Sequence, residues 1–218
     1  MLSLILSLLI AAFAFGTGAT KLFKKGTPLY WQLYVCAAGC FALRQLSETV
    51  NFLCGIQGNI SVGMLGIFGC NFFLLSADYG TLDKVVDDGS AENKPARKLA
   101  LLAPVVTAAL IASVFFAWRK NDLVCGVLWL AMLLPMLPAS YFNLKHLLMP
   151  PDDFELLRAT RPCNLASLGV YLLSALCGAA CGLGNTALAE VTSVALSASM
   201  LWLVCAAVKG RKKWKTCC

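Results

Sequence analysis

Apolar residues occur along this chain in long runs that are separated by short polar segments. A helix that crosses the hydrocarbon core of a membrane needs roughly 17–25 mainly apolar residues. Seven runs reach this length, and each of them predicts one transmembrane helix. The runs cover about 2–20, 29–50, 60–79, 99–118, 123–143, 164–183 and 186–208. The pattern therefore predicts an all-α protein in which residues 1–218 form a single bundle of seven transmembrane helices.

The second run has a distinct polar side. Residues that recur at steps of three and four share one side of a helix. In this run they are Tyr30, Leu33, Ala37, Cys40, Arg44, Ser47 and Asn51. Most of these side chains are small or polar, so we expect this side to face other helices and Arg44 to lie inside the bundle. An arginine within an apolar span is by default a functional-site hypothesis. The alternative, that Arg44 extends to the outer headgroups, stays open.

Composition and charge agree with a membrane protein and orient it. The chain is 59% hydrophobic and 13% charged, whereas soluble domains are roughly 45–50% apolar and about 25% charged. If the amino terminus is outside, fifteen of the eighteen Lys and Arg residues lie on the cytoplasmic side and only Arg119 and Lys120 lie outside. Loops rich in Lys and Arg stay in the cytoplasm, so the basic tail 209–218 is expected there. The net charge of +7 then indicates contact with the bilayer and its anionic lipid at the inner face, and not with nucleic acid.

The sequence gives weaker indications of how the chain is processed than of its topology. Residues 1–20 have the length of a secretory signal, but the basic residues follow the apolar run instead of preceding it. We therefore expect a retained first span, with cleavage as the alternative. Most of the eleven cysteines fall inside spans, where cysteine acts as a small apolar residue. A disulfide between Cys54 and Cys125 is not favoured, and acylation of Cys217 or Cys218 stays open.

Several polar residues share a depth near the outer face. Arg44, Glu48 and Asn51 end the second span, and Glu190 begins the seventh. Arg44 and Glu48 are one helical turn apart, a spacing at which an ion pair can form. Together with Asn71 of the third span, these residues predict an outer-leaflet pocket that binds a small polar or anionic ligand.

Polar residues also mark the inner face. Asp78 lies near the inner interface, where we expect ordinary solvation, and Asp83 and His146 lie in the predicted inner loops. The loop 80–98 is acidic, but it lacks the full spacing of a calcium-binding loop, so no metal is expected. Pro135 and Pro138 predict a kink in the fifth span.

The sequence excludes several kinds of chemistry. Its single histidine rules out two-histidine haem ligation and H-E-x-x-H zinc sites. There is no C-x-x-C motif, no G-x-S-x-G elbow and no Gly-rich phosphate loop. We therefore expect no cofactor.

The sequence is compatible with three functions. The first is a sensor or receptor-like module of the plasma membrane, in which the outer pocket binds a ligand and any signal passes to a separate partner protein. The second is a small-solute transporter whose route continues to Asp78. The third is a lipid-modifying enzyme at the inner interface, with Asp78, Asp83, Asp87 and Asp88 as its acidic groups.

Overall fold

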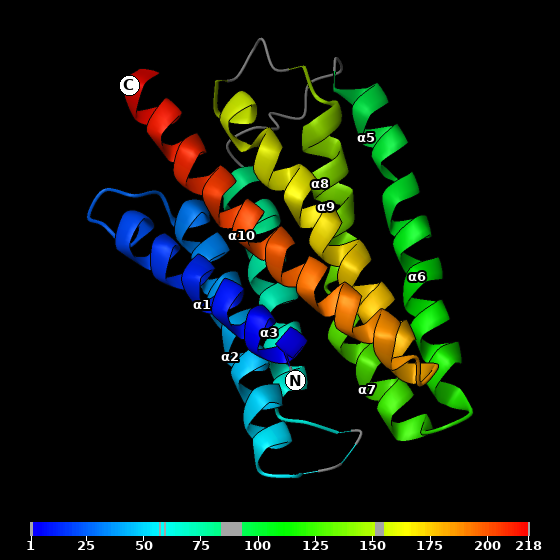
Figure 1. The fold of residues 1–218 in the computed structure, drawn as a ribbon. Coiled ribbons are helices and arrows are strands. Elements are labelled where there is room, and N and C mark those ends of the chain that lie inside the picture. The colour runs from blue at the N-terminus through cyan, green and yellow to red at the C-terminus, as the bar shows by residue number, and fades with distance from the viewer. Residues whose placement is uncertain (1, 57, 59, 84–92, 151–154, 218) are drawn as a thin grey trace.

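The computed structural model describes residues 2–56, 58, 60–83, 93–150 and 155–217, and this part of the chain consists of helices and turns without a β-strand. The all-α fold class is therefore confirmed. Figure 1 shows the helices side by side in one bundle. They are α1 (Leu2–Leu22), α2 (Leu29–Leu53), α3 (Gly63–Leu75), the π-helical η1 (Ser76–Leu82), α5 (Lys94–Ala100), α6 (Leu102–Arg119), α7 (Leu123–Leu133), α8 (Met136–Leu148), α9 (Glu155–Gly182) and α10 (Thr186–Cys217).

Much of the bundle is apolar on the outside as well as the inside. Phe13, Val105 and Val124 are each more than 60% exposed, and large apolar surfaces of this kind are rare on soluble monomers. In the described residues, five helical stretches are long and apolar enough to cross a membrane. They are Leu2–Leu22, Lys94–Arg119, Leu123–Leu148, Leu156–Gly182 and Thr186–Trp214. The structure thus supports a membrane protein.

Helix α2 has its polar side turned inward. Arg44 and Gln45 are buried, whereas Leu43 and Leu46 on the other side are 65% and 47% exposed. This is the reverse of a soluble amphipathic helix, and it suits a helix whose outer face meets acyl chains. The prediction that Arg44 faces the interior is confirmed.

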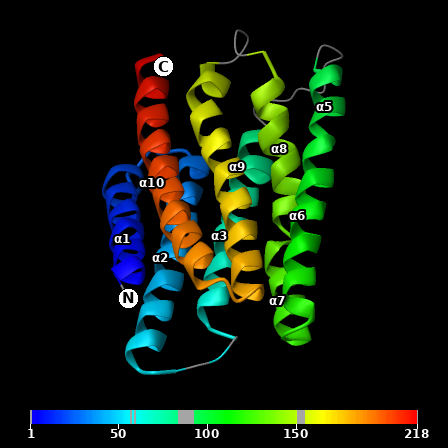
Figure 2. The same cartoon turned by 45° about the vertical axis from the view of Figure 1, so that its right-hand side comes forward.

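The helices pack in a definite order. Helix α10 lies between α1 and α9, α2 packs against α1 and α3, and α6 packs against α7, α8 and α9. Figure 2 shows the same arrangement from another direction and places the two termini toward opposite ends of the bundle. We call the end with the carboxyl terminus of α10 the basic end, because Lys209, Arg211, Lys212 and Lys213 lie in the last turns of that helix. The α2–α3, α6–α7 and α9–α10 connections lie at the opposite end.

Two predicted spans are interrupted. The fifth breaks at Leu134 and Pro135, between α7 and α8, as its prolines predict. Proline removes a backbone donor and clashes with the preceding turn. The third changes from α-helical to π-helical at Ser76, which the sequence pattern does not reveal.

Cys54 and Cys125 are both free thiols.

Helices α2 and α3 approach each other closely at Gly66. A Cβ atom added there would lie 2.6 Å from the Cys40 carbonyl oxygen and 2.7 Å from Cβ of Arg44. Small residues permit this kind of contact between membrane helices. The contact fixes the position of Arg44 against α3.

Side chains from neighbouring helices bind the carbonyl groups at several helix ends. Asn121 Nδ2 donates to the Gly182 carbonyl at the end of α9, at 2.7 Å. Arg161 Nη2 donates to the carbonyls of Leu147 and Met149 at the end of α8, and Arg211 Nη1 donates to the Lys21 carbonyl of α1. These carbonyls have no partner within their own helix, so the contacts connect each end to the bundle.

Candidate functional site

Arg44 lies in the interior, where it pairs with no carboxylate of the described residues. Its side chain is 7% exposed, and its Nη2 lies 4.0 Å from Sγ of Cys177 on α9. Among the described residues, its Nη1 has no hydrogen-bond partner, and no carboxylate oxygen lies within 4.0 Å of the guanidinium. The guanidinium carbon also lies 5.8 Å from the centre of the Phe41 ring. A buried positive charge is thus left with only weak partners.

Two adjoining cavities reach Arg44 at the end of the bundle opposite the basic end. The first, of about 320 Å³, is bordered by the α2–α3 connection, by Trp118 and Trp129, and by the α9–α10 turn. The second, of about 280 Å³, lies between α1, α2, α9 and α10 and includes Glu190. Arg44 and Glu48 line both cavities. Arg44 therefore lies beside two spaces that are each large enough for a small ligand.

Glu48 does not pair with Arg44, although their spacing on α2 would allow an ion pair. Its Oε1 accepts a hydrogen bond from Oγ of Ser61 at 2.9 Å, and Asn51 Nδ2 donates to the same Ser61 oxygen at 3.3 Å. Ser61 lies just before α3, where its Oγ also accepts from the Gly63 N–H at 2.9 Å. The α2–α3 connection thus holds Glu48 away from the guanidinium.

The five predicted ligand-binding residues do not all meet. Arg44 and Glu48 border both cavities, Glu190 borders the second, and Asn51 reaches the first through Ser61. Asn71 lies about 7 Å further along α3 than Gly66, at 1.5 Å per residue. There its Nδ2 donates to the Met132 carbonyl at 3.4 Å, and Asn71 lines neither cavity.

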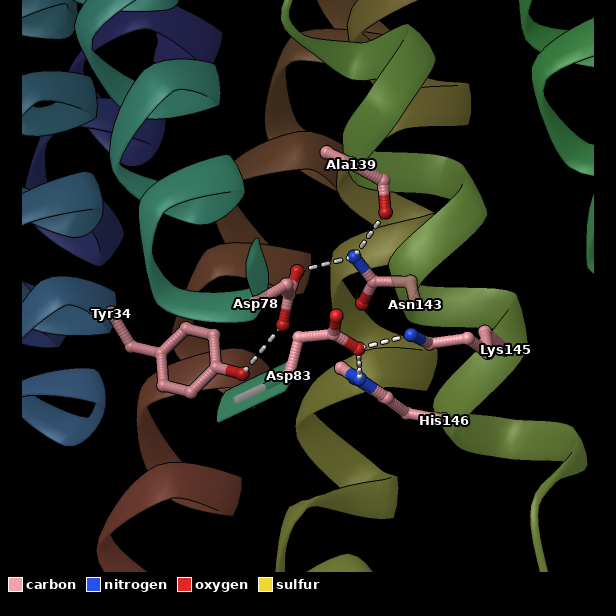
Figure 3. Close-up of polar contacts among 7 residues, drawn as sticks. All are labelled: Tyr34, Asp78, Asp83, Ala139, Asn143, Lys145 and His146. Carbon is pink, nitrogen blue, oxygen red and sulfur yellow. Dashed lines mark hydrogen bonds and ion pairs between the residues drawn. The ribbon is translucent and has the colours of Figure 1, made fainter. Parts of the chain in front are cut away.

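A second polar cluster lies toward the basic end and is centred on Asp78 (Figure 3). Tyr34 Oη donates to Asp78 Oδ1 at 3.2 Å, and Asn143 Nδ2 donates to Oδ2 at 2.5 Å. The same amide lies 3.4 Å from Oη of Tyr171. Asp78 is fully buried, so the expectation that solvent surrounds it is wrong. The side chains that bind Asp78 in place of water come from α2 and α8.

Asp83 joins the same cluster one π-helical turn later. Its Oδ1 contacts Lys145 Nζ and accepts from His146 Nε2 at 3.0 Å. Figure 3 shows both groups reaching Asp83 from α8. Partial burial alone would raise the pKa of Asp83, but the hydrogen bonds from His146 and Lys145 outweigh it and hold this pKa below its ordinary value of 3.8. An aspartate that orients an imidazole is a common arrangement for proton transfer.

The three residues predicted for the inner face lie close together, but their surroundings differ from the expectation. The structure brings Asp78, Asp83 and His146 together, yet His146 lies in α8 and is fully buried instead of occupying a loop. Asp87 and Asp88, which the enzyme hypothesis needs, lie outside the described residues. In the described residues no group of three or more His, Cys, Asp and Glu is placed to hold a metal ion.

Sequence reasoning missed several partners. Ser61, Cys177 and Trp118 border the cavities or contact Arg44, and Tyr34 and Asn143 bind Asp78. The sequence does mark Asn143, because it is a lone amide within an apolar helical run that leads into Lys145. The sequence does not mark Cys177 as a neighbour of Arg44, since that contact depends on how α9 packs against α2.

Comparison with known proteins identifies no relative: no protein family, no curated protein and no solved structure matches this chain.

Proposed function

We propose that this protein is a receptor-like membrane module that binds a small polar ligand carrying an anionic group at Arg44. The observation that carries the proposal is a buried guanidinium that lines two cavities and pairs with no carboxylate of the described residues. Glu48 borders the same space and can accept a hydrogen bond from a donor on the ligand. The walls formed by Trp118 and Trp129 would cover its apolar part.

An unpaired charge inside a protein is energetically costly. Transferring a cation from water into a protein without a compensating partner costs on the order of several kcal/mol. A carboxylate or phosphate can bind the planar guanidinium through two parallel hydrogen bonds. Binding would thus recover part of the cost, and the ligand-free protein would tolerate that cost because Arg44 is needed for recognition.

The proposal includes a topology. We propose that α2 and the α3–η1 stretch cross the membrane together with the five apolar stretches, which gives seven crossings with the amino terminus outside. The opposite positions of the two termini support an odd number of crossings. In this orientation the cavities open toward the outer face of the plasma membrane, and any signal passes to a separate protein at the basic end.

The test is ligand-dependent thermal stabilisation of the purified protein in detergent. Amino acids, short carboxylates, glycerol 3-phosphate and inorganic phosphate serve as probes. A probe at a hundred times its Kd should stabilise the wild type by about 2.7 kcal/mol. Arg44→Leu should abolish this shift, and Arg44→Lys should weaken it because an ammonium lacks the planar fork.

Arg119→Leu is the matched control, because it removes an exposed arginine at the same end of the bundle without touching either cavity. It should respond to the probe like the wild type. Without a probe, Arg44→Leu should melt at the wild-type temperature or above it, since an apolar residue can replace a buried charge without loss. An unchanged probe response in Arg44→Leu would contradict the proposal.

A second candidate function is transport of a small solute. It is favoured by polar groups buried beyond the cavities toward the basic end, since Asn71 and Asp78 are each fully buried about 10 Å apart along the helix at 1.5 Å per residue. Proteoliposomes that take up a bound probe, and lose this uptake in Asp78→Asn while still binding it, would favour transport. Binding without uptake in the wild type would favour the receptor-like module.

A further inference from the structure

The basic end of the bundle has a groove between α9 and α10 that is lined by cations. A cavity of about 260 Å³ lies there, and Arg158, Lys209 and Lys213 line it. Arg158 and the two lysines are exposed. The other walls are apolar and include Trp202 and Cys205.

The groove changes from basic to apolar along α10. Trp202, Cys205, Lys209 and Lys213 follow one another at steps of three and four, so they share one side of the helix. The indole of Trp202 begins seven residues before Lys209, which places it about 10 Å further from the basic end at 1.5 Å per residue. Tryptophan is enriched at the depth where lipid headgroups meet acyl chains. The cations lie nearer the basic end and the indole lies deeper. This order matches that of a phospholipid, in which the phosphate is followed by glycerol and then by the acyl chains.

We propose that this groove binds an anionic phospholipid that ends in a phosphomonoester. Arg158, Lys209 and Lys213 contact the phosphate, and an acyl chain lies against Trp202. A phosphomonoester carries about −1.5 to −2 charges near neutral pH, which suits three cations better than the single charge of a phosphodiester. The guanidinium of Arg158 also matches two phosphate oxygens at once. Soluble phosphates share the headgroup chemistry but leave the apolar wall uncovered.

The test must separate a defined site from the general positive field of this end. A second basic cavity, of about 230 Å³, lies between α1 and α10 and includes Lys21, Lys24 and Lys212, so positive charge alone will attract any anionic lipid. Native mass spectrometry of the full chain in detergent would follow titration with phosphatidate, phosphatidylserine, phosphatidylcholine and glycerol 3-phosphate. We expect phosphatidate to bind most tightly and glycerol 3-phosphate weakly.

Two double variants that each remove two positive charges decide between site and field. Each juxtamembrane cation contributes about 1 kcal/mol, so Lys209→Gln with Lys213→Gln should weaken phosphatidate binding about thirtyfold. Lys94→Gln with Lys98→Gln changes exposed lysines of α5 that do not line the groove, and it should bind like the wild type. Cys205→Trp should also weaken binding, because it fills the apolar part of the groove without changing the charge.

Three outcomes would overturn the proposal. Equal losses in the two double variants, or equal affinity for phosphatidate and phosphatidylserine, would indicate a diffuse field. Glycerol 3-phosphate binding as tightly as phosphatidate would indicate a soluble phosphate instead of a lipid. Melting curves without lipid confirm that each variant is folded, and the exposed lysine variants keep the test valid if Cys205→Trp does not fold.

Discussion

At the scale of single residues, the bundle treats its buried charges in two different ways. Asp78 accepts hydrogen bonds from Tyr34 and Asn143, and Asp83 contacts Lys145 and His146. Arg44, at the other end, has a thiol and an aromatic ring as its neighbours. Buried polar groups are normally satisfied. The acidic cluster follows this rule, whereas Nη1 of Arg44 has no hydrogen-bond partner among the described residues.

The contact of Asp83 with Lys145 predicts an acid-sensitive contribution to stability. Asp83→Asn should destabilise the protein by about 1–3 kcal/mol, less than for a fully buried pair because Asp83 is partly exposed. The pKa of Asp83 is lowered on folding, so its contribution is complete above the ordinary value and disappears as the pH falls through the lowered one. Melting temperatures of wild type and variant should therefore differ at about pH 7, and should converge only as the pH falls well below about 4.

A double-mutant cycle provides the control for this prediction. Lys145→Gln alone and together with Asp83→Asn should give a coupling energy of about 0.5–3 kcal/mol. Additive losses would show that the two side chains act independently, and a difference between wild type and Asp83→Asn that persists in acid would contradict the pH argument.

The sequence predicted which residues are buried better than it predicted their partners. Helical spacing placed Arg44 on the inner side of α2, because that stripe contains most of the small residues. It also suggested a pair with Glu48, which fails because Ser61 from the next connection takes the glutamate. Partners of this kind depend on where a second element lies, and spacing within one helix carries no information about that.

At the scale of elements, the α2–α3 contact at Gly66 controls where Arg44 lies. Gly66→Ala should destabilise the protein by about 1–3 kcal/mol, because the added Cβ would collide with the backbone of Cys40 and with Arg44. The same substitution should reduce probe binding at Arg44 by separating the two helices. Thermal melts with and without probe measure both effects.

Gly16→Ala is the matched control for this contact. No atom lies within 4 Å of a Cβ at Gly16 on α1, so this variant should be as stable as the wild type or slightly more stable. Equal behaviour of the two alanine variants would show that the α2–α3 contact is looser than the structure indicates.

The elements themselves could be predicted to different degrees. The apolar runs located the helices, since hydrocarbon requires long apolar segments, and Pro135 marked the break between α7 and α8. The π-helical segment at Ser76 could not be foreseen, because it arises where Asp78 and Asp83 both turn toward partners on neighbouring helices. Helix α8 also continues to Leu148, past the predicted end of its span, and its buried Lys145 and His146 contact Asp83 there.

At the scale of the whole molecule, the proposed seven crossings predict that the two termini lie on opposite sides of the membrane. An epitope tag before Leu2 should bind antibody on intact cells, and a tag after Cys218 should bind only after permeabilisation. Lys and Arg concentrate at the end that holds the carboxyl terminus, and this bias sets orientation. Two tags that are accessible from the same side would exclude an odd number of crossings.

The packing of the first helix against the last has a consequence for biosynthesis. Gly18 of α1 lies against Val204 of α10, and Arg211 of α10 donates a hydrogen bond to the carbonyl of Lys21 in α1. Almost the entire polypeptide must therefore leave the ribosome before α1 acquires this neighbour. Until then its small-residue face remains open to lipid or to the insertion machinery, and a premature stop codon upstream of α10 would leave that face uncovered for cellular quality control to detect.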